Sequence, residues 1–294
     1  MRIAKMPAAF WSNTIWYLIL GIVTVVQLFV LLKKTKNRKQ VLAFFFIISG
    51  LTFCIEAVIC CFLKAYSYYP LLIPQSSIDD KLAGNLFSQY SITTTALFFP
   101  VFKLSSYWLF IFSGMYGIVE ELFLKLGIYE HHWYRTWLTI IGLPFLFLLF
   151  NKMYHSTAIY RPSMPRYLFM ALGLYSIHMP IFFWIQILTG IIRPSTTFLA
   201  DPMNSYALIS LVNLFLLSIV CMFVYYAKLK WFWKLLITLV LYGVIYLAGT
   251  LNLLYIKEGW FLLFASIDIG GMYLSILLLD KLLQPSLKFR KYIS

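Results

Sequence analysis

Residues 82–102, LAGNLFSQYSITTTALFFPVF, determine how many times this chain crosses a membrane. The segment has the ~20 residues that a helix needs to span a hydrocarbon layer of about 30 Å. It also carries many amide and hydroxyl side chains, which are Asn85, Ser88, Gln89, Ser91, Thr93, Thr94 and Thr95. Hydropathy alone therefore leaves this segment ambiguous, and the rest of the chain has to decide.

The rest of the chain consists mainly of long apolar stretches. Of its 294 residues, 62% are hydrophobic and 12% are charged, against about a quarter charged in soluble globular proteins. Windows of ~19 residues find eight further spans near 11–32, 41–63, 105–127, 134–153, 167–192, 205–227, 232–256 and 260–279. Together they predict an all-α, polytopic transmembrane bundle of about nine helices, forming a single integral membrane domain over residues 1–294. The first span is too long for a cleaved secretory signal, and no internal repeat is visible.

Basic residues favour nine crossings over eight. If 82–102 crosses, four basic segments share one side: 33–39, 151–166, 228–234 and the tail with Lys288, Arg290 and Lys291. Because Lys and Arg accumulate in cytoplasmic loops, we expect the amino terminus outside and the carboxyl terminus in the cytoplasm, in the plasma membrane of a bacterium. The net charge of +14 lies in these short clusters, which favours contact with anionic headgroups at the cytoplasmic face and argues against nucleic acid.

Ionisable side chains within the apolar spans are the best indication of activity. Each costs at least ~2.5 kcal/mol at the bilayer centre unless it is paired or hydrated. Counting ~1.5 Å per residue from the helix ends places Glu56, Glu120 and Asp268 roughly 10–12 Å below the outer face, with Gln89 at a similar level. We therefore expect the four to converge on one polar layer, where carboxylates must share protons, meet a cation or line a wet cavity.

These residues also have structural interpretations. Glu121 and Lys125 have the spacing of a stabilising pair within one helix, which leaves Glu120 as the favoured functional carboxylate. Glu56 and Glu120 could instead each be held by a neighbouring hydroxyl group. The polar segment 82–102 could line a pathway, or it could join helices through hydrogen bonds worth ~0.6 kcal/mol each.

Histidines occur near this layer in two segments. The run GIYEHHWYRTW, residues 127–137, predicts an aromatic belt at the outer interface, with Tyr129, His131, His132, Trp133 and Arg135. Adjacent histidines cannot both face one metal from a regular helix, so we expect solvated histidines, no metal and no cofactor. His178, which precedes Met179-Pro180, is either a core histidine bonded to a backbone carbonyl or a proton relay at a hinge.

One short segment resembles a known motif. The run EELFLKLG, Glu120 to Gly127, resembles the EExxxR motif of CAAX-type intramembrane glutamate proteases, with Lys125 in place of Arg. That family also has an aromatic residue four positions before a histidine, and a further histidine on a later helix. Here Leu174 stands four positions before His178, and no histidine follows it. The catalytic roles of the family are therefore not assigned to this chain.

These observations favour a membrane protein that binds or translocates a small solute or cation. Protonation of Glu56, Glu120 and Asp268 would be coupled to a polar cavity lined by the third helix. One alternative is a membrane enzyme that acts on lipid or isoprenoid substrates through the same carboxylates. The other is a non-catalytic scaffold or receptor subunit. The absence of the common hydrolase and nucleotide-binding motifs favours a protein that is not an enzyme.

Overall fold

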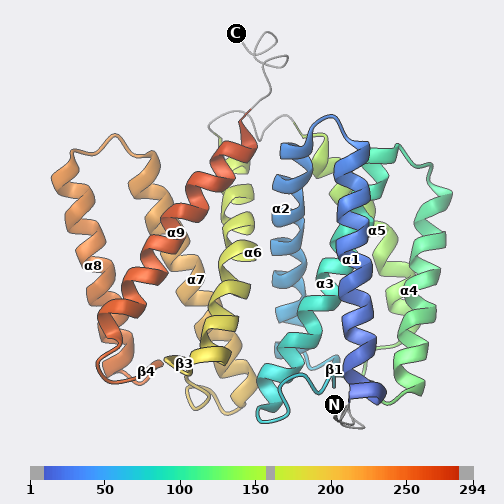
Figure 1. The fold of residues 1–294 in the computed structure, drawn as a ribbon, viewed down its shortest axis with the longest axis horizontal. Helices are drawn as coiled ribbons and strands as arrows, with labels where there is room; N and C mark the ends of the chain where they lie inside the picture. The colour runs from blue at the N-terminus through green and yellow to red at the C-terminus, as the bar shows by residue number, and fades with distance from the viewer. Residues whose placement is uncertain (1–9, 157–162, 285–294) are drawn as a thin grey trace, which may run out of the picture. The chain divides into compact units, whose positions relative to one another are not determined.

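A computed structural model describes residues 10–156 and 163–284 (Figure 1). Within these ranges the chain forms nine α-helices and four short strands, which confirms the predicted all-α bundle. The helices are α1 (Ile15–Lys34), α2 (Arg38–Glu56), α3 (Ser77–Phe102), α4 (Tyr107–Lys125), α5 (Thr136–Tyr154), α6 (Met164–Thr189), α7 (Pro202–Tyr226), α8 (Trp231–Thr250) and α9 (Phe261–Leu283). The strands are β1 (Tyr66–Tyr68), β2 (Tyr129–His131), β3 (Ile192–Pro194) and β4 (Leu254–Ile256). Arg161 and the predicted basic tail of Lys288, Arg290 and Lys291 lie outside the described residues.

The chain is a multi-pass membrane protein by the length and composition of its helices. Among the described helices, eight are long and apolar enough to cross a membrane. The polar helix α3 is not one of the eight, but its 26 residues are long enough to extend about 39 Å. The side of the membrane on which each terminus lies stays a prediction.

The chain falls into two compact units, Met1–Thr157 and Ala158–Ser294, which we call unit 1 and unit 2. After α1, unit 1 has the order α2–β1–α3–α4–β2–α5, and unit 2 has the order α6–β3–α7–α8–β4–α9. In each unit the two strands pair antiparallel. No internal repeat was predicted from the sequence, but the two units repeat the same order of helices and strands. The repeat is one of architecture, without visible similarity between the residues of the two units. The single integral membrane domain stays a prediction.

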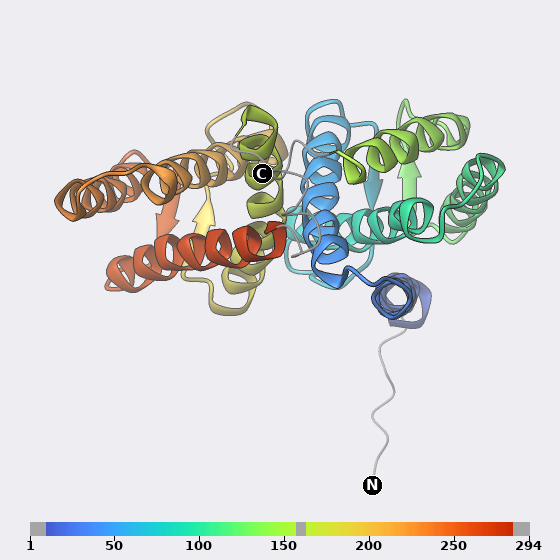
Figure 2. The same cartoon turned by 90° about the horizontal axis from the view of Figure 1, so that it is seen from above.

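Helix α3 forms the centre of unit 1, where it packs against α1, α2 and α5, while α1 stands at the edge of the unit (Figure 2). Its polar side chains find partners on neighbouring helices. Oγ1 of Thr94 donates a 2.6 Å hydrogen bond to Oε1 of Gln27 on α1. On α4, the hydroxyl of Tyr116 lies 2.9 Å from both Oγ of Ser91 and Oγ1 of Thr95. This half of α3 joins helices, as one of the two interpretations of 82–102 expected.

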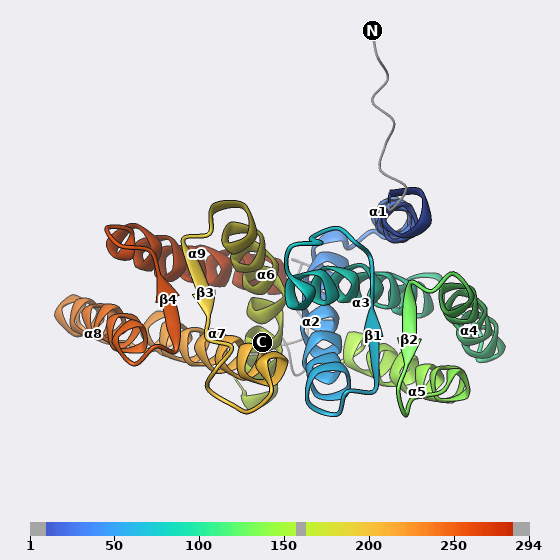
Figure 3. The ribbon, with the colours of Figure 1, turned by 90° about the horizontal axis from the view of Figure 1, so that it is seen from below.

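Strands β1 and β2 lie across one end of the helices of unit 1 (Figure 3). Tyr66 is opposite His131, and Tyr68 is opposite Tyr129. Because successive side chains of a strand point to opposite faces, these four residues share one face of the strand pair. We call it the inner face, since two of its side chains bond to Glu56 of α2.

Two features of α3 hold β1 in place. A Cβ atom on Gly84 would lie 2.7 Å from Cβ of Tyr68, so only glycine lets the strand come this near the helix. Asp80, in the first turn of α3, accepts hydrogen bonds from the backbone N–H groups of residues 71, 72 and 73 at 3.0, 2.8 and 2.9 Å. The connection from β1 to α3 is therefore fixed by a buried carboxylate.

The strand pair of unit 2 has a different inner face. Ile192 is opposite Ile256, and Pro194 is opposite Leu254, so the residues that share this face are all apolar. Ile192 and Leu254 are buried. The same architecture is thus built in unit 2 without polar side chains on the inner face of its strands.

Candidate functional site

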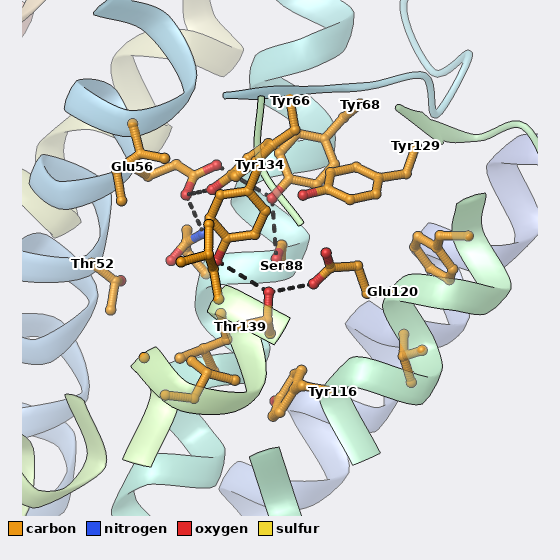
Figure 4. A pocket seen from close by; sticks show the side chains of 18 of the residues that line it. Thr52, Glu56, Tyr66, Tyr68, Ser88, Tyr116, Glu120, Tyr129, Tyr134 and Thr139 are labelled. Atoms are coloured by element: carbon orange, nitrogen blue, oxygen red, sulfur yellow. Dashed lines mark hydrogen bonds between the residues drawn. The ribbon is translucent and has the colours of Figure 1, made fainter. Parts of the chain in front are cut away.

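Unit 1 contains a cavity of about 470 Å³ between its helices and its strand pair (Figure 4). Ligand sites in proteins usually measure about 300–1,000 Å³. The polar residues that line the cavity are Tyr17, Thr52, Glu56, Tyr66, Tyr68, Ser88, Gln89, Tyr116, Glu120, Tyr129, Tyr134 and Thr139. Trp133 also lines the cavity and is 51% exposed, which makes it the most exposed of the large apolar side chains in the lining.

The carboxylate of Glu56 lies in the buried part of the cavity lining. It is the last residue of α2, directly before a π-helical turn over Ala57–Phe62, a feature that is frequent at functional sites. Oε2 accepts hydrogen bonds from the hydroxyl of Tyr66 at 2.6 Å and from Nε2 of Gln89 at 3.0 Å. Oε1 accepts one from the hydroxyl of Tyr68 at 3.2 Å. Donors from β1 and α3 thus meet one acceptor-only group.

Glu120 reaches the cavity from α4. Its Oε1 lies 2.6 Å from Nε2 of His131 on the inner face, and its Oε2 accepts a short hydrogen bond from Oγ1 of Thr139 on α5. The same Thr139 oxygen lies 3.1 Å from the hydroxyl of Tyr134. The prediction of a solvated His131 is wrong, because the strand turns its side chain inward, where only 11% of it is exposed.

The tyrosines of the strand end keep their protons. Burial, followed by the charge on Glu56, raises the pKa of Tyr66 and of Tyr68 well above its usual value. Burial also raises the pKa of Tyr129, and it raises that of Tyr134 to about 12. These hydroxyls therefore remain neutral donors at any physiological pH, which suits their position beside carboxylates.

The cavity lining contains two acidic residues. Of the lining residues, Glu56 and Glu120 are acidic, and none is lysine or arginine. Within residues 10–156 and 163–284 no group of three or more His, Cys, Asp or Glu side chains could hold a metal ion. The site can therefore attract positive charge without offering the ligand set of a protein metal site.

The two remaining predicted site residues, His178 and Asp268, lie in unit 2. Nε2 of His178 on α6 lies 2.6 Å from Oδ1 of Asp268 on α9, and both side chains are buried. Among the described residues, Oδ2 of Asp268 has no hydrogen-bond partner. The two residues line a cavity of about 90 Å³ whose other walls are apolar, apart from Gly271. His178 is thus bonded to a carboxylate and not to a backbone carbonyl.

The structure brings some predicted residues together and separates others. Glu56, Gln89 and Glu120 line one cavity in unit 1, whereas Asp268 and His178 meet each other in unit 2. Glu121 accepts a hydrogen bond from Oγ1 of Thr136 at 2.5 Å. The expected pair of Glu121 with Lys125 is not among the ion pairs of the described residues.

The predicted belt is divided between the two faces of the strand end. Tyr129 is buried in the cavity lining, while His132 is exposed and its Nε2 lies 3.1 Å from Oγ of Ser67. Nε1 of Trp133 donates to the backbone oxygen of Leu63 at 2.6 Å. Arg135 donates to backbone oxygens nearby, including that of His132 at 3.1 Å.

Four residues of the site were not predicted from the sequence to take part in binding. Tyr66, Tyr68, Tyr134 and Thr139 contact the two glutamates or their partners, and all four lie at helix ends or between helices. The alternation Tyr-Ser-Tyr over residues 66–68 was the available signal, because a period of two indicates a strand with one inward face.

Comparison with models of known protein families, with curated proteins and with solved structures finds no match to this chain.

Proposed function

We propose that this multi-pass membrane protein binds a small solute in the cavity of unit 1 and carries it across the membrane. The observation that carries the proposal is the contrast between the two strand pairs. Unit 2 builds the same architecture with apolar residues on its inner face, whereas unit 1 places three tyrosines and His131 there. The polar set of unit 1 is therefore not a requirement of the architecture, and a binding role accounts for it.

The distribution of basic residues supports an orientation for this function. Lys33 and Lys34 end α1, Arg38 begins α2 and Lys152 lies in the last turn of α5, at the helix ends away from β1 and β2. By the bias of cytoplasmic loops toward Lys and Arg, those ends face the cytoplasm of a bacterial cell and contact anionic lipid headgroups. The strand end, and with it the exposed Trp133 of the cavity lining, then faces the outside.

A solute screen tests the binding step. The purified full chain is heated with solutes that span cations, anions and neutral molecules, and the unfolding temperature is compared with that of Glu56→Gln and Glu120→Gln. A solute at 100 times its Kd stabilises a protein by about 2.7 kcal/mol. We expect at least one solute class to stabilise wild type and not the two variants. Glu130→Gln is the control, because Glu130 lies on the outward face and is exposed.

The result that contradicts the proposal is equal stabilisation of wild type, Glu56→Gln and Glu120→Gln by every solute that has any effect. Transport is then measured in liposomes with the stabilising solute. If uptake of the solute is the same in wild type and Glu120→Gln, the proposed translocation is contradicted and only the binding step stands.

A second function is favoured by one contact. The 2.6 Å approach of His131 to Glu120 has the arrangement of a general base and the carboxylate that orients it. A membrane enzyme acting on lipids would lose its product in His131→Ala, as measured by mass spectrometry of the lipid fraction. If the lipid profile is the same before and after wild-type protein is added to the lipids, the enzymatic function is contradicted.

A further inference from the structure

The charge of the cavity indicates the sign of its ligand. The acidic residues Glu56 and Glu120 reach it from α2 and α4, with tyrosine side chains between them in the view of Figure 4. Among the described lining residues none is lysine or arginine, and His131 lies 2.6 Å from the carboxylate of Glu120. Carboxylates in a low-dielectric site attract positive charge far more strongly than they would in water.

The aromatic side chains indicate what kind of cation fits. The ring of Tyr66 lies 5.6 Å from that of Tyr68 and 4.9 Å from that of Tyr134, with ring planes at 75° and 77°. The ring of Tyr129 lies 5.2 Å from that of Tyr66. These distances and angles are those of edge-to-face packing between rings. The same tyrosines line the cavity, and the face of a tyrosine ring attracts a cation within about 6 Å of its centroid, as in the recognition of alkylated ammonium groups.

A calcium or magnesium ion fits this cavity poorly. Ca²⁺ takes six to eight oxygen ligands, and Mg²⁺ keeps several waters in an octahedral shell. Here the oxygens of Glu56 already accept hydrogen bonds from two tyrosines and Gln89, and both oxygens of Glu120 contact His131 or Thr139. A volume of about 470 Å³ is also far larger than one metal ion occupies.

We infer that the ligand of this cavity is an organic ammonium ion, a positively charged nitrogen that carries alkyl groups. This inference rests on the proposed function and names its solute class. The charged nitrogen lies against the rings of Tyr66, Tyr68 and Tyr134, within the field of the two carboxylates. The alkyl groups contact apolar lining residues such as Ile55 and Leu138.

Isosteric probes test the inference directly. Choline and 3,3-dimethylbutan-1-ol have the same shape, but carbon replaces the charged nitrogen in the second. Butylammonium and butan-1-ol form a second pair. Calorimetric titration into the full chain in lipid nanodiscs is expected to show binding of at least one of the two cations, at least tenfold tighter than its neutral partner.

Substitution of Tyr68 separates the ring from its hydroxyl group. Tyr68→Phe keeps the aromatic face, and we expect the Kd of the bound cation to stay within about threefold. Tyr68→Leu removes the face and is expected to weaken binding roughly 2- to 30-fold. Tyr255→Leu is the matched control, because Tyr255 lies on β4 of unit 2 and is 62% exposed.

The possible failures are distinguishable. The ammonium inference is overturned if each neutral isostere binds as tightly as its cation. It is also overturned if only anionic or neutral solutes of the screen lose their stabilising effect in Glu56→Gln and Glu120→Gln. In both cases the binding function stands. Equal displacement of the bound probe by NaCl and by tetramethylammonium chloride at the same ionic strength also overturns the ammonium inference. If no solute of any charge depends on the two glutamates, both proposals fail.

Discussion

Replacing Glu56 by glutamine should destabilise unit 1 even though the side chain keeps its size. The carboxylate accepts three hydrogen bonds, from Tyr66, Tyr68 and Gln89. Hydrogen bonds to a charged group contribute about 1.5–3 kcal/mol each, and neutral ones about 1 kcal/mol. The amide loses at least one of the three and weakens the others, whereas relief from burying a charge offsets part of the loss. We expect the free energy of unfolding to fall by about 2–4 kcal/mol.

The assay is equilibrium unfolding of the full chain in mixed detergent micelles, followed by tryptophan fluorescence. Glu130→Gln is the matched control, because Glu130 is an exposed strand residue whose carboxylate accepts one bond from Tyr69 at 2.7 Å. It should change stability by no more than about 0.5 kcal/mol. In a double-mutant cycle, Tyr66→Phe and Glu56→Gln should show a coupling energy of about 0.5–3 kcal/mol.

One result would contradict a structural role for the Glu56 carboxylate. If Glu56→Gln is as stable as wild type and its coupling to Tyr66→Phe is zero, the carboxylate does not organise β1 and α3. The cavity would then lack the fixed polar wall on which the binding proposal depends.

Three further predictions concern the framework of both units. Gly84→Ala should destabilise by about 1–3 kcal/mol in the same unfolding assay, because its methyl group would overlap Tyr68, while Gly114→Ala, which meets no atom within 4 Å, should not destabilise. Asp80→Ala should release residues 71–73, which we expect to see as new proteolytic cleavage there and a loss of about 2–4 kcal/mol; an unchanged cleavage pattern contradicts this. His178→Ala should cost about 3–5 kcal/mol because it leaves a buried carboxylate unpaired, and a loss below 1 kcal/mol would mean that the pair is not a charged one.

The helices could be predicted from sequence because a bilayer imposes both their length and their apolar composition. The position of α3 required one more argument, since seven polar side chains hide its hydropathy and only the charge of distant loops indicated a crossing. Its boundary was placed too late, at residue 82 and not at Ser77, because an apolar window leaves out the polar first turn of the helix. Asp80 lies in this turn and accepts hydrogen bonds from the connection that precedes the helix.

The sequence predicted the depth of the site below the membrane face, but not which side chains contact each other there. Distance from a helix end gives one coordinate, and for Glu56, Gln89 and Glu120 that coordinate was sufficient to suggest a shared layer. It gives no rotation about the helix axis, so the partner of Asp268 could not be identified as His178. The three-residue strands were not predicted because windows of ~19 residues average over them. The inward orientation of His131 was therefore not predicted either, since it follows from its position in β2.

The most direct test of the account is the reactivity of a single cysteine at Ser88, which lines the cavity within 3.5 Å of the hydroxyl of Tyr68. The four native cysteines are first replaced, and Ser88→Cys is treated with a cationic and an anionic methanethiosulfonate reagent of similar size. We expect faster modification by the cationic reagent, with the ratio of the two rates falling toward one when Glu56→Gln and Glu120→Gln are added. Thr197→Cys, in an exposed part of unit 2, controls for intrinsic reactivity. No modification by either reagent, or equal rates with both glutamates intact, would contradict an accessible, negatively charged cavity.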